Sequence, residues 1–487
     1  MAEHILALDL GTTGVRALIV HASGRVVGQA WRALDASFPS PGWVEQDPGQ
    51  MWNRSVEVMR ESLAEAPLDV GDIAALGVVS QRSTAIAWEA HSETPLHPAL
   101  GWQDGRTSAR VAELVALGVP VNTLASCTKF EWLVENVPSV REAGEGHRLK
   151  LGTPDVWLTE RLTGGEAFVT DMGNAGCTGL LDAGSRAWWP LAMELFGVAE
   201  GWLPSLVASS EIVAETPAQL LGGAIPVAAR AGDQQAASFA QAVHAEGEAK
   251  LTLGTAGMLN LHTGGEAREG PPGTYALPLW ELTPGECSFC LEGTVVTAGA
   301  VVDWLVELGM LEAPASLDRV AGSLEHTDGV VFVPALQGLG TPFLDEGARG
   351  LWGGLTRGST AAHLVRAALE GIAHRCADVI AALPADIPTL RVDGGLAQSD
   401  LLLQRIADFS GCEIQRAAET ETTALGAAFL AALAVGLLSS ADEIPGLLAA
   451  PTRFVPGLTT AERERARSDW GRALSRSQAR EQAASFE

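Results

Sequence analysis

The alternation of short apolar runs with polar turns predicts an α/β protein. An apolar run at residues 5–8 stops at Asp9, turns through Gly-Thr-Thr-Gly at 11–14 and resumes at 17–20, which is the pattern of a β-hairpin. Longer segments with apolar residues on one face predict helices between the strands. Strands are expected at 26–30, 73–80, 85–88, 224–232, 249–253, 258–261, 289–292, 330–334 and 390–393, and helices at 49–64, 108–117, 129–136, 154–162, 234–243, 297–309, 363–383 and 423–437.

The first hairpin turn has the composition of a phosphate-binding turn. Glycine lets backbone N–H groups approach a ligand closely, and such groups, together with the two threonine hydroxyls, hold phosphate oxygens. Asp9 in front of the turn suits a hydrated Mg²⁺ ion, and Arg16 behind it adds a fixed positive charge. Because four-residue motifs recur by chance, an ordinary hairpin is the alternative interpretation of this stretch alone.

The second half of the chain repeats this motif. Residues 251–257 read L-T-L-G-T-A-G, against L-D-L-G-T-T-G at 8–14. A phosphate turn near the start of each half predicts two related domains that face each other across a nucleotide, and we expect them to span residues 1–243 and 244–487. The sequence contains neither G-x-x-x-x-G-K-[ST] nor G-x-G-x-x-G, so an ATP site here uses other phosphate-binding turns.

Charge and composition exclude several classes of function. The formal net charge of −27 argues against nucleic acid and anionic membrane surfaces as partners. The longest apolar run, residues 424–438, is shorter than the roughly 20 residues that cross a bilayer, so we expect no membrane insertion. A basic secretory leader is lacking, and six cysteines in 487 residues do not make a disulfide framework. We therefore expect a cytoplasmic protein.

Two polar clusters follow predicted strands in the first half. Q-R-S-T at 81–84 comes directly after the strand 73–80, and open α/β sheets place ligands at the carboxyl ends of their strands. In the second cluster, W-Q-D-G-R-T, Trp102 offers an apolar wall. Arg82 and Asp104 add a donor and an acceptor, which suits a small polyhydroxy compound. Surface ion pairing beside a core tryptophan is the alternative interpretation.

A single acid marks the end of the first half. Asp233 follows the predicted strand 224–232 and opens the predicted helix 234–243. A shielded carboxylate at this point acts as a general base when a hydroxyl lies within hydrogen-bonding reach. Taken alone, the residue is more simply explained as a helix N-cap.

Taken together, the motifs resemble the FGGY family of carbohydrate kinases, in the actin/hexokinase/Hsp70 superfamily. The resemblance covers nearly the whole chain and rests on A-L-D-L-G-T-T-G-V-R, Q-R-S-T, W-Q-D-G-R-T, A-G-D-Q-Q-A-A, L-G-T-A-G, L-E-G-T, V-D-G-G and T-A-L-G-A-A, in that order. It implies two RNase H-like domains around a central nucleotide cleft. It also implies ATP and Mg²⁺ as cofactors and transfer of the γ-phosphate to a hydroxyl of a sugar or polyol.

The resemblance also assigns roles to single residues. It implies that Asp233 takes the proton of the attacking hydroxyl, that Asp9 faces the metal and that Arg16 neutralises the transferring phosphoryl group. The residues expected to bind the nucleotide are Gly11, Thr12, Thr13, Gly254, Thr255, Gly299, Gly394, Gly395 and Ser399. The residues expected in the polyol pocket are Gln81, Arg82, Ser83, Trp102, Asp104, Asp233 and Gln234.

Three residues depart from the members of the family that phosphorylate glycerol. Ser83 stands where those members usually have Glu, Leu124 where they have Tyr, and Met258 where they have Phe. Glycerol is the first expected substrate, and xylulose, ribulose and erythritol are the alternatives. A catalytically silent ATP-binding regulator is a further alternative, because this fold alone does not imply sugar phosphorylation. Members of the family form dimers and tetramers, and either state is compatible with the sequence.

Overall fold

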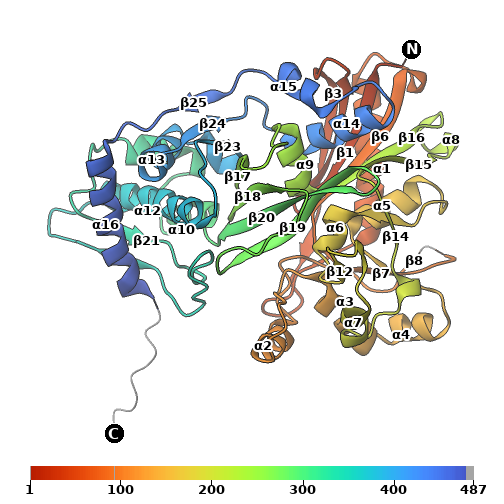
Figure 1. Cartoon of the computed structure of the whole chain (residues 1–487), viewed down its shortest axis with the longest axis horizontal. Coiled ribbons are helices and arrows are strands. Elements are labelled where there is room, and N and C mark those ends of the chain that lie inside the picture. The colour runs from red at the N-terminus through yellow and green to blue at the C-terminus, as the bar shows by residue number, and fades with distance from the viewer. Residues whose placement is uncertain (1, 93, 479–487) are drawn as a thin grey trace, which may run out of the picture.

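The computed structural model describes residues 2–92 and 94–478, and it contains two large sheets, one in each half of the chain (Figure 1). The first sheet has the strand order β15-β16-β6-β1-β2-β3. Its strands are β1 (His4–Leu10), β2 (Gly14–His21), β3 (Val26–Ala33), β6 (Ile73–Ser80), β15 (Ser210–Glu215) and β16 (Pro226–Gly232).

The second sheet has the order β19-β20-β18-β17-β23-β24-β25. Its strands are β17 (Ala249–Leu253), β18 (Gly257–Gly264), β19 (Thr274–Thr283), β20 (Glu286–Val295), β23 (Thr389–Asp393), β24 (Glu413–Arg416) and β25 (Thr452–Phe454).

The two sheets share one plan. In the first, β1 pairs antiparallel with β2 and parallel with β6, which in turn pairs parallel with β16. In the second, β17 pairs antiparallel with β18 and parallel with β23, which pairs parallel with β24. The hairpins β1–β2 and β17–β18 therefore occupy equivalent places, and the internal repeat predicted from seven residues is confirmed as a repeat of topology.

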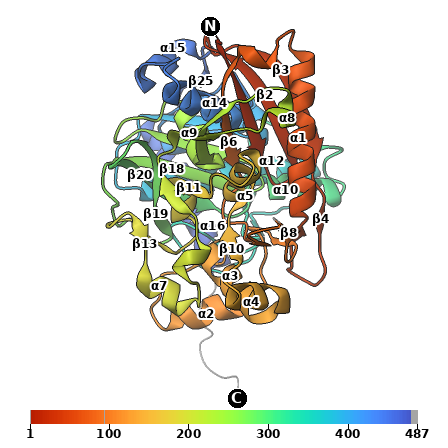
Figure 2. The same cartoon turned by 90° about the vertical axis from the view of Figure 1, so that its right-hand side faces the viewer.

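Helices cover these sheets and bury their apolar faces. Helix α1 (Pro48–Glu65), capped by Asp47, lies against β2 and β3 (Figure 2). Further helices are α5 (Pro154–Leu162), α9 (Asp233–Ala240), α10 (Gly299–Glu307), α12 (Ala361–Ala382), α13 (Asp400–Ser410), α14 (Thr422–Ala434) and α16 (Thr460–Ser477).

The remaining helices and strands complete the described chain. The helices are α2 (Ser108–Ala116), α3 (Ser126–Asn136), α4 (Pro138–Glu145), α6 (Met172–Gly176), α7 (Pro190–Leu195), α8 (Ala218–Leu221), α11 (Leu317–Ala321) and α15 (Ile444–Leu447). The strands are β4 (Ala36–Ser37), β5 (Glu45–Gln46), β7 (Ile86–Glu89), β8 (Thr94–Pro95), β9 (Ala99–Leu100), β10 (Leu149–Gly152), β11 (Val169–Asp171), β12 (Leu181–Asp182), β13 (Ala187–Trp188), β14 (Ser205–Val207), β21 (Val331–Val333) and β22 (Leu351–Gly353).

Helix α14 belongs to the second half by sequence but packs on the first sheet and on α9 (Figure 1). Small residues make this contact possible. A Cβ atom at Gly77 of β6 would stand 2.3 Å from the carbonyl oxygen of Ala427, and one at Gly426 would stand 2.0 Å from that of Ala236. The predicted role of the Ala/Gly-rich segment, tight packing on a sheet, is confirmed. In the described part of the chain, 2–92 and 94–478, no helix combines the length and the apolar character that crossing a bilayer requires.

Candidate functional site

The first glycine–threonine turn joins β1 to β2 and lies beside the tryptophan of the second polar cluster. The amide of Gly11 donates to the carbonyl of Gly14 at 2.9 Å, which closes the turn. The indole Nε1 of Trp102 donates to the hydroxyl of Thr12 at 2.9 Å, and Gln46 donates to the carbonyl of Thr12 at 2.8 Å. The structure therefore brings an expected phosphate turn and an expected substrate residue into direct contact.

Asp9 and Arg16 flank this turn as register partners on the two strands of the hairpin. The guanidinium of Arg16 forms an ion pair with Glu421, the residue that precedes α14. Burial raises the pKa of Asp9 to about 7, and the charge of Asp233 adds to this rise, whereas Arg16 opposes it. Ser80 of β6 pairs with both Leu10 of β1 and Gly232 of β16, so Asp9 and Asp233 lie at the same edge of the first sheet.

Asp233 is the first residue of α9, and the N-cap of that helix is Gly232. The N-cap interpretation is therefore wrong by one residue: the carboxylate accepts from the amide of its neighbour Gln234 at 2.7 Å. A third of the Asp233 side chain is exposed (33%). Burial raises its pKa and Glu292 adds to the rise, whereas Arg82 and Lys250 lower it. A carboxyl that is shielded yet reachable is the environment in which a general base is found.

Arg82 joins the two halves of the chain at this point. Its Nε lies 3.3 Å from Oδ1 of Asp233, and its Nη2 lies 2.9 Å from Oε2 of Glu292 on β20. Asn260 of β18 donates to the same oxygen of Glu292 at 2.9 Å. Burial alone lowers the pKa of Arg82, but the charges of Glu292, Cys177 and Asp233 raise it above its ordinary value. The arginine thus keeps its charge beside Asp233.

The residues next to Arg82 are held by buried polar contacts. Gln81 is buried and donates to the side chain of Gln46 at 2.8 Å. Ser83 has a positive φ of 66°, a left-handed conformation that side chains seldom adopt. The buried amine of Lys129 donates to the carbonyls of Ser83 at 3.4 Å and of Leu124 at 3.1 Å. One lysine therefore fixes the backbone of two positions that depart from the family pattern.

Asp104 does not face open space. Its side chain is fully buried and accepts from the amide of Val44 at 2.6 Å and from Nε and Nη2 of Arg106 at 2.8 and 2.9 Å. Arg106 in turn lies over the ring of Trp43, 3.9 Å from its centroid. This geometry does not support the direct contact with a polyol that we expected of Asp104. The carboxylate instead fixes the loop that carries Trp102.

The second turn, between β17 and β18, is built by backbone packing. The amide of Gly254 donates to Ala256 at 3.0 Å, and the amide of Gly299, at the start of α10, donates to Gly254 at 2.9 Å. A Cβ at Gly299 would stand 2.6 Å from the carbonyl of Gly254, so only glycine lets the helix approach this closely. Gly394, at φ 93°, packs in the same way on the carbonyl of Leu253. Three residues expected at the nucleotide therefore lie side by side.

Three further residues expected at the nucleotide belong to the second half of the chain. Thr255 is exposed, and its carbonyl accepts from the amides of Ala298 and Ala300 at the start of α10. Gly395 follows Gly394, and a Cβ there would meet nothing within 4 Å. Ser399 caps α13 and also bonds to Asp318, so its hydroxyl has structural partners.

Glu292, Lys250 and Lys129 are residues of this region whose roles sequence reasoning missed. Lys250 is fully buried in β17 and donates to the hydroxyl of Thr252 at 2.6 Å and to the side chain of Gln234 at 3.1 Å. The composition could have drawn attention to the two lysines. The chain has only three lysines, and Lys129 and Lys250 interrupt otherwise buried segments. Glu292 lies within the L-E-G-T motif, which carried the resemblance without a stated role.

The described carboxylates of this region do not converge on one point. Among residues 2–92 and 94–478, no three His, Cys, Asp or Glu side chains converge as a metal cluster. Mg²⁺ is commonly held by one or two carboxylates together with substrate phosphates. The pair Asp9 and Asp233 therefore fits Mg²⁺ brought by a nucleotide better than a cation held by protein alone.

Comparison with known proteins agrees with this architecture. The N-terminal domain model of the FGGY family of carbohydrate kinases matches residues 4–240, and the C-terminal domain model matches residues 249–435. The chain is 40% identical over 494 residues to a glycerol kinase of Solidesulfovibrio magneticus, covering 98% of this chain and 99% of that protein.

Solved structures give the same result for the fold. The crystal structure of Plasmodium falciparum glycerol kinase with ADP superimposes with a TM-score of 0.91 at 27% identity, covering 98% of each chain. A ligand-bound xylulose kinase of Lactobacillus acidophilus shares the fold, with a TM-score of 0.86 at 21% identity and 97% coverage of each chain. The predicted two-domain α/β fold is confirmed.

Proposed function

Because the chain belongs to the FGGY family of carbohydrate kinases, we propose that it catalyses the ATP-dependent phosphorylation of a small polyol, with glycerol as the first candidate. Relatives named glycerol kinase that align over nearly the whole chain support this substrate. The observation that carries the proposal is the placement of Asp9 and Asp233 at one edge of the first sheet, where β1 and β16 end on either side of β6, with Nε of Arg82 3.3 Å from Oδ1 of Asp233.

In this proposal the two turns hold the phosphates of ATP from opposite sides. The backbone of Gly11 and the hydroxyls of Thr12 and Thr13 contact the transferring end, and Gly254 and Thr255 contact the phosphates from the second domain. Gly299 and Gly394 shape the surface next to Gly254 on which the adenosine lies. Phosphoryl transfer needs mainly alignment and charge neutralisation, and bound Mg²⁺ supplies part of that neutralisation.

Asp233 acts in this scheme as the general base. It accepts the proton of the attacking hydroxyl, while Arg82 orients a neighbouring oxygen of the polyol and keeps the carboxylate in place at 3.3 Å. Arg16 neutralises charge on the transferring group. This requires Arg16 to leave Glu421, its partner in the structure. Trp102 packs against the carbon face of the polyol and fixes Thr12 through its indole N–H.

The altered pocket residues define the competing substrates. Ser83 replaces a carboxylate with a hydroxyl that lies 3.5 Å from the carbonyl of Cys177. An unpaired polyol hydroxyl in a buried site costs about 1–3 kcal/mol, so a sugar or polyol that does not need this acceptor competes with glycerol. Erythritol, xylulose and ribulose are therefore the alternatives.

The test is an ADP-release assay with ATP, Mg²⁺ and each of glycerol, erythritol, xylulose and ribulose. The proposal expects turnover that depends on the acceptor, with the largest kcat/KM for glycerol. Turnover of a different acceptor would support the kinase activity but replace glycerol as its substrate. Tight ATP binding without turnover of any acceptor contradicts the kinase and favours the silent regulator.

We also propose the cytoplasm as the compartment. All six cysteines are free thiols in the structure, and four of the five most buried ones lie in the apolar interior of helices and strands. Free thiols are typical of reducing compartments. Fractionation of the native host with an antibody against the chain tests this assignment.

A further inference from the structure

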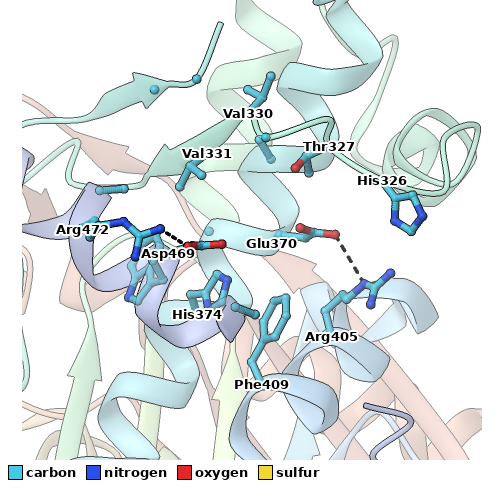
Figure 3. Close-up of a pocket in the computed structure, with 18 of the residues that line it drawn as sticks. His326, Thr327, Val330, Val331, Glu370, His374, Arg405, Phe409, Asp469 and Arg472 are labelled. Carbon is cyan, nitrogen blue, oxygen red and sulfur yellow. Dashed lines mark hydrogen bonds and ion pairs between the residues drawn. The ribbon is translucent and has the colours of Figure 1, made fainter. Parts of the chain in front are cut away.

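A cavity of about 560 Å³ lies in the second domain, and none of its lining residues belongs to the candidate site. It is lined by residues of α12, α13 and α16 and of the chain at 325–331 (Figure 3). Its volume is within the range of about 300–1,000 Å³ that small-molecule sites occupy. The space is therefore large enough for a metabolite, and the question is which polar groups face it.

His374 of α12 is the most constrained polar group in the cavity wall. Its ring is 7% exposed and lies stacked between Phe409 and Trp470, with centroid separations of 3.8 and 4.9 Å. Arg467 donates to its Nδ1 at 3.1 Å. Burial holds the pKa of His374 well below its ordinary value, and Arg467 and Arg405 lower it further, so the ring is neutral at physiological pH.

The tautomer of His374 follows from these contacts. Because Nδ1 accepts a hydrogen bond from an arginine, the single ring proton of the neutral form resides on Nε2. No residue in the described ranges accepts a hydrogen bond from Nε2, and this atom is not sealed from solvent. His374 thus presents a rigid donor to the cavity.

Arg405 of α13 supplies a second fixed donor. Its Nη1 lies 3.1 Å from Asp408, and its Nε lies 3.5 Å from Glu370 (Figure 3). Within the described chain its Nη2 has no hydrogen-bond partner. The charge of Glu370 is already balanced, because Arg366 also donates to it at 2.7 Å. The guanidinium is therefore held in place while one of its nitrogens stays available.

The rest of the wall includes an apolar floor and a charged rim. Val330, Phe409 and Trp470 are buried floor residues. Two arginines of α16 lie at the rim. Arg472 pairs with Asp469 (Figure 3). Arg476 has no ion-pair partner in the described chain. Three acids, Glu325, Glu370 and Asp469, also line the cavity, and two of them, Glu370 and Asp469, are paired with arginines.

We propose that this cavity binds a small organic anion, a carboxylate or phosphate ester on a short carbon chain. Its oxyanion accepts hydrogen bonds from Nε2 of His374 and Nη2 of Arg405, and its carbon chain lies on the floor at Val330 and Trp470. Charge-assisted hydrogen bonds from fixed donors are the strong ones. Arg476 adds attraction at the entrance.

The test is equilibrium dialysis of the full chain, without nucleotide, against radiolabelled inorganic phosphate and, separately, radiolabelled D-glycerate. The wild type is expected to bind at least one probe saturably, and the probe that binds identifies the phosphate or the carboxylate as the preferred group. His374→Phe keeps an aromatic ring in the stack but removes the donor, and Arg405→Met removes the second donor. Each variant is expected to weaken binding about tenfold or more.

Two further variants keep the outcome clear. Arg476→Met changes an exposed residue and is expected to fold normally and to bind several-fold more weakly, so it decides the matter where Arg405→Met fails to fold. Arg319→Met, on the exposed surface of α11 in the same domain, is the matched control and is expected to bind like the wild type. Absence of saturable binding, or binding that all three cavity variants retain, overturns the proposal. No measurement here depends on kinase activity.

Discussion

The two glycine–threonine turns have the same place in their sheets but different surroundings. In the first, Asp9 and Arg16 stand on either side of the turn; the equivalent residues of the second are Thr252 and Leu259, which carry no charge. Trp102 and Gln46 fix the first turn through side chains. The second is fixed by backbone amides of α10. One scaffold thus serves a charged turn in one domain and an uncharged turn in the other.

This difference suggests that the two turns have different roles, although the repeated motif alone would make them equivalent. Charges placed where bonds change stabilise a transition state, whereas backbone amides and close glycine packing suit the steady holding of a nucleotide. The first turn contacts Trp102 and lies at the sheet edge where Asp233 follows β16, and the second lies beside Gly299 and Gly394. The comparison therefore predicts that changes near the first turn lower turnover and that changes near the second lower nucleotide affinity.

Replacement of Asp233, the proposed base, is the strongest test of this division. Asp233→Asn keeps the size of the side chain and its contact with Gln234, but it cannot accept the proton of the hydroxyl. General bases contribute about 10²–10⁴-fold to turnover, so kcat is expected to fall by that range, while the Kd for ADP measured by calorimetry stays nearly unchanged. A fall of only a few-fold would remove Asp233 from this role.

Asp9 tests the charged turn through both activity and stability. Its pKa of about 7, against an ordinary 3.8, means that the folded chain retains a proton that the unfolded chain releases. A raised carboxyl pKa destabilises the folded state progressively as pH rises from about 4 to about 7. Asp9→Asn removes that penalty. The variant is expected to lose most turnover and Mg²⁺ dependence, yet to gain in Tm at pH 8.

The pH dependence supplies the control for this prediction. The gain in Tm for Asp9→Asn is expected to shrink as the pH is lowered and to vanish near pH 4, where the wild-type carboxyl is protonated in both states. A thermal-shift series from pH 4 to pH 8 measures it. An equal gain at every pH would point to a change in packing, and a loss of Tm at pH 8 would contradict the raised pKa.

These contrasts also show what the sequence reveals and what it leaves out. The hairpins at 5–20 and 249–261 were predictable because apolar runs and glycine turns are local patterns. The contacts of Arg82 with Glu292 and of Arg16 with Glu421 join residues hundreds of positions apart, and no local pattern encodes such pairs. Asp104 illustrates a related limit. The sequence shows that Arg106 is nearby, but it does not show that the Asp104 carboxylate is buried and pairs with this arginine.

Glu292 extends the comparison to the second domain, because it contacts Arg82, which is also the ion-pair partner of Asp233. Its charge raises the pKa of Asp233, and it holds Arg82 at 2.9 Å. Glu292→Gln is expected to lower the pKa of Asp233. The pH profile of kcat/KM reports the ionisable groups of the free enzyme, so its acidic limb is expected to move to lower pH. Because a weaker base accepts the proton less well, kcat is expected to fall about tenfold or less. Glu292→Asp, which keeps the charge, is the control; an equal loss at every pH would indicate a purely structural role.

The smallest expected effects come from the paired threonines of the turns, which make the most direct comparison. Thr255→Val removes an exposed hydroxyl from the uncharged turn, and the net value of one hydrogen bond, about 0.5–1.5 kcal/mol, predicts a Kd for ADP raised by about two- to tenfold with little change in kcat. Thr12→Val removes the acceptor of Trp102 as well, so it is expected to lower kcat/KM for the polyol more than ADP affinity. Calorimetry and steady-state kinetics on both variants decide the matter. If the two substitutions gave the same pattern, the turns would share one task and the charges around the first would not explain its role.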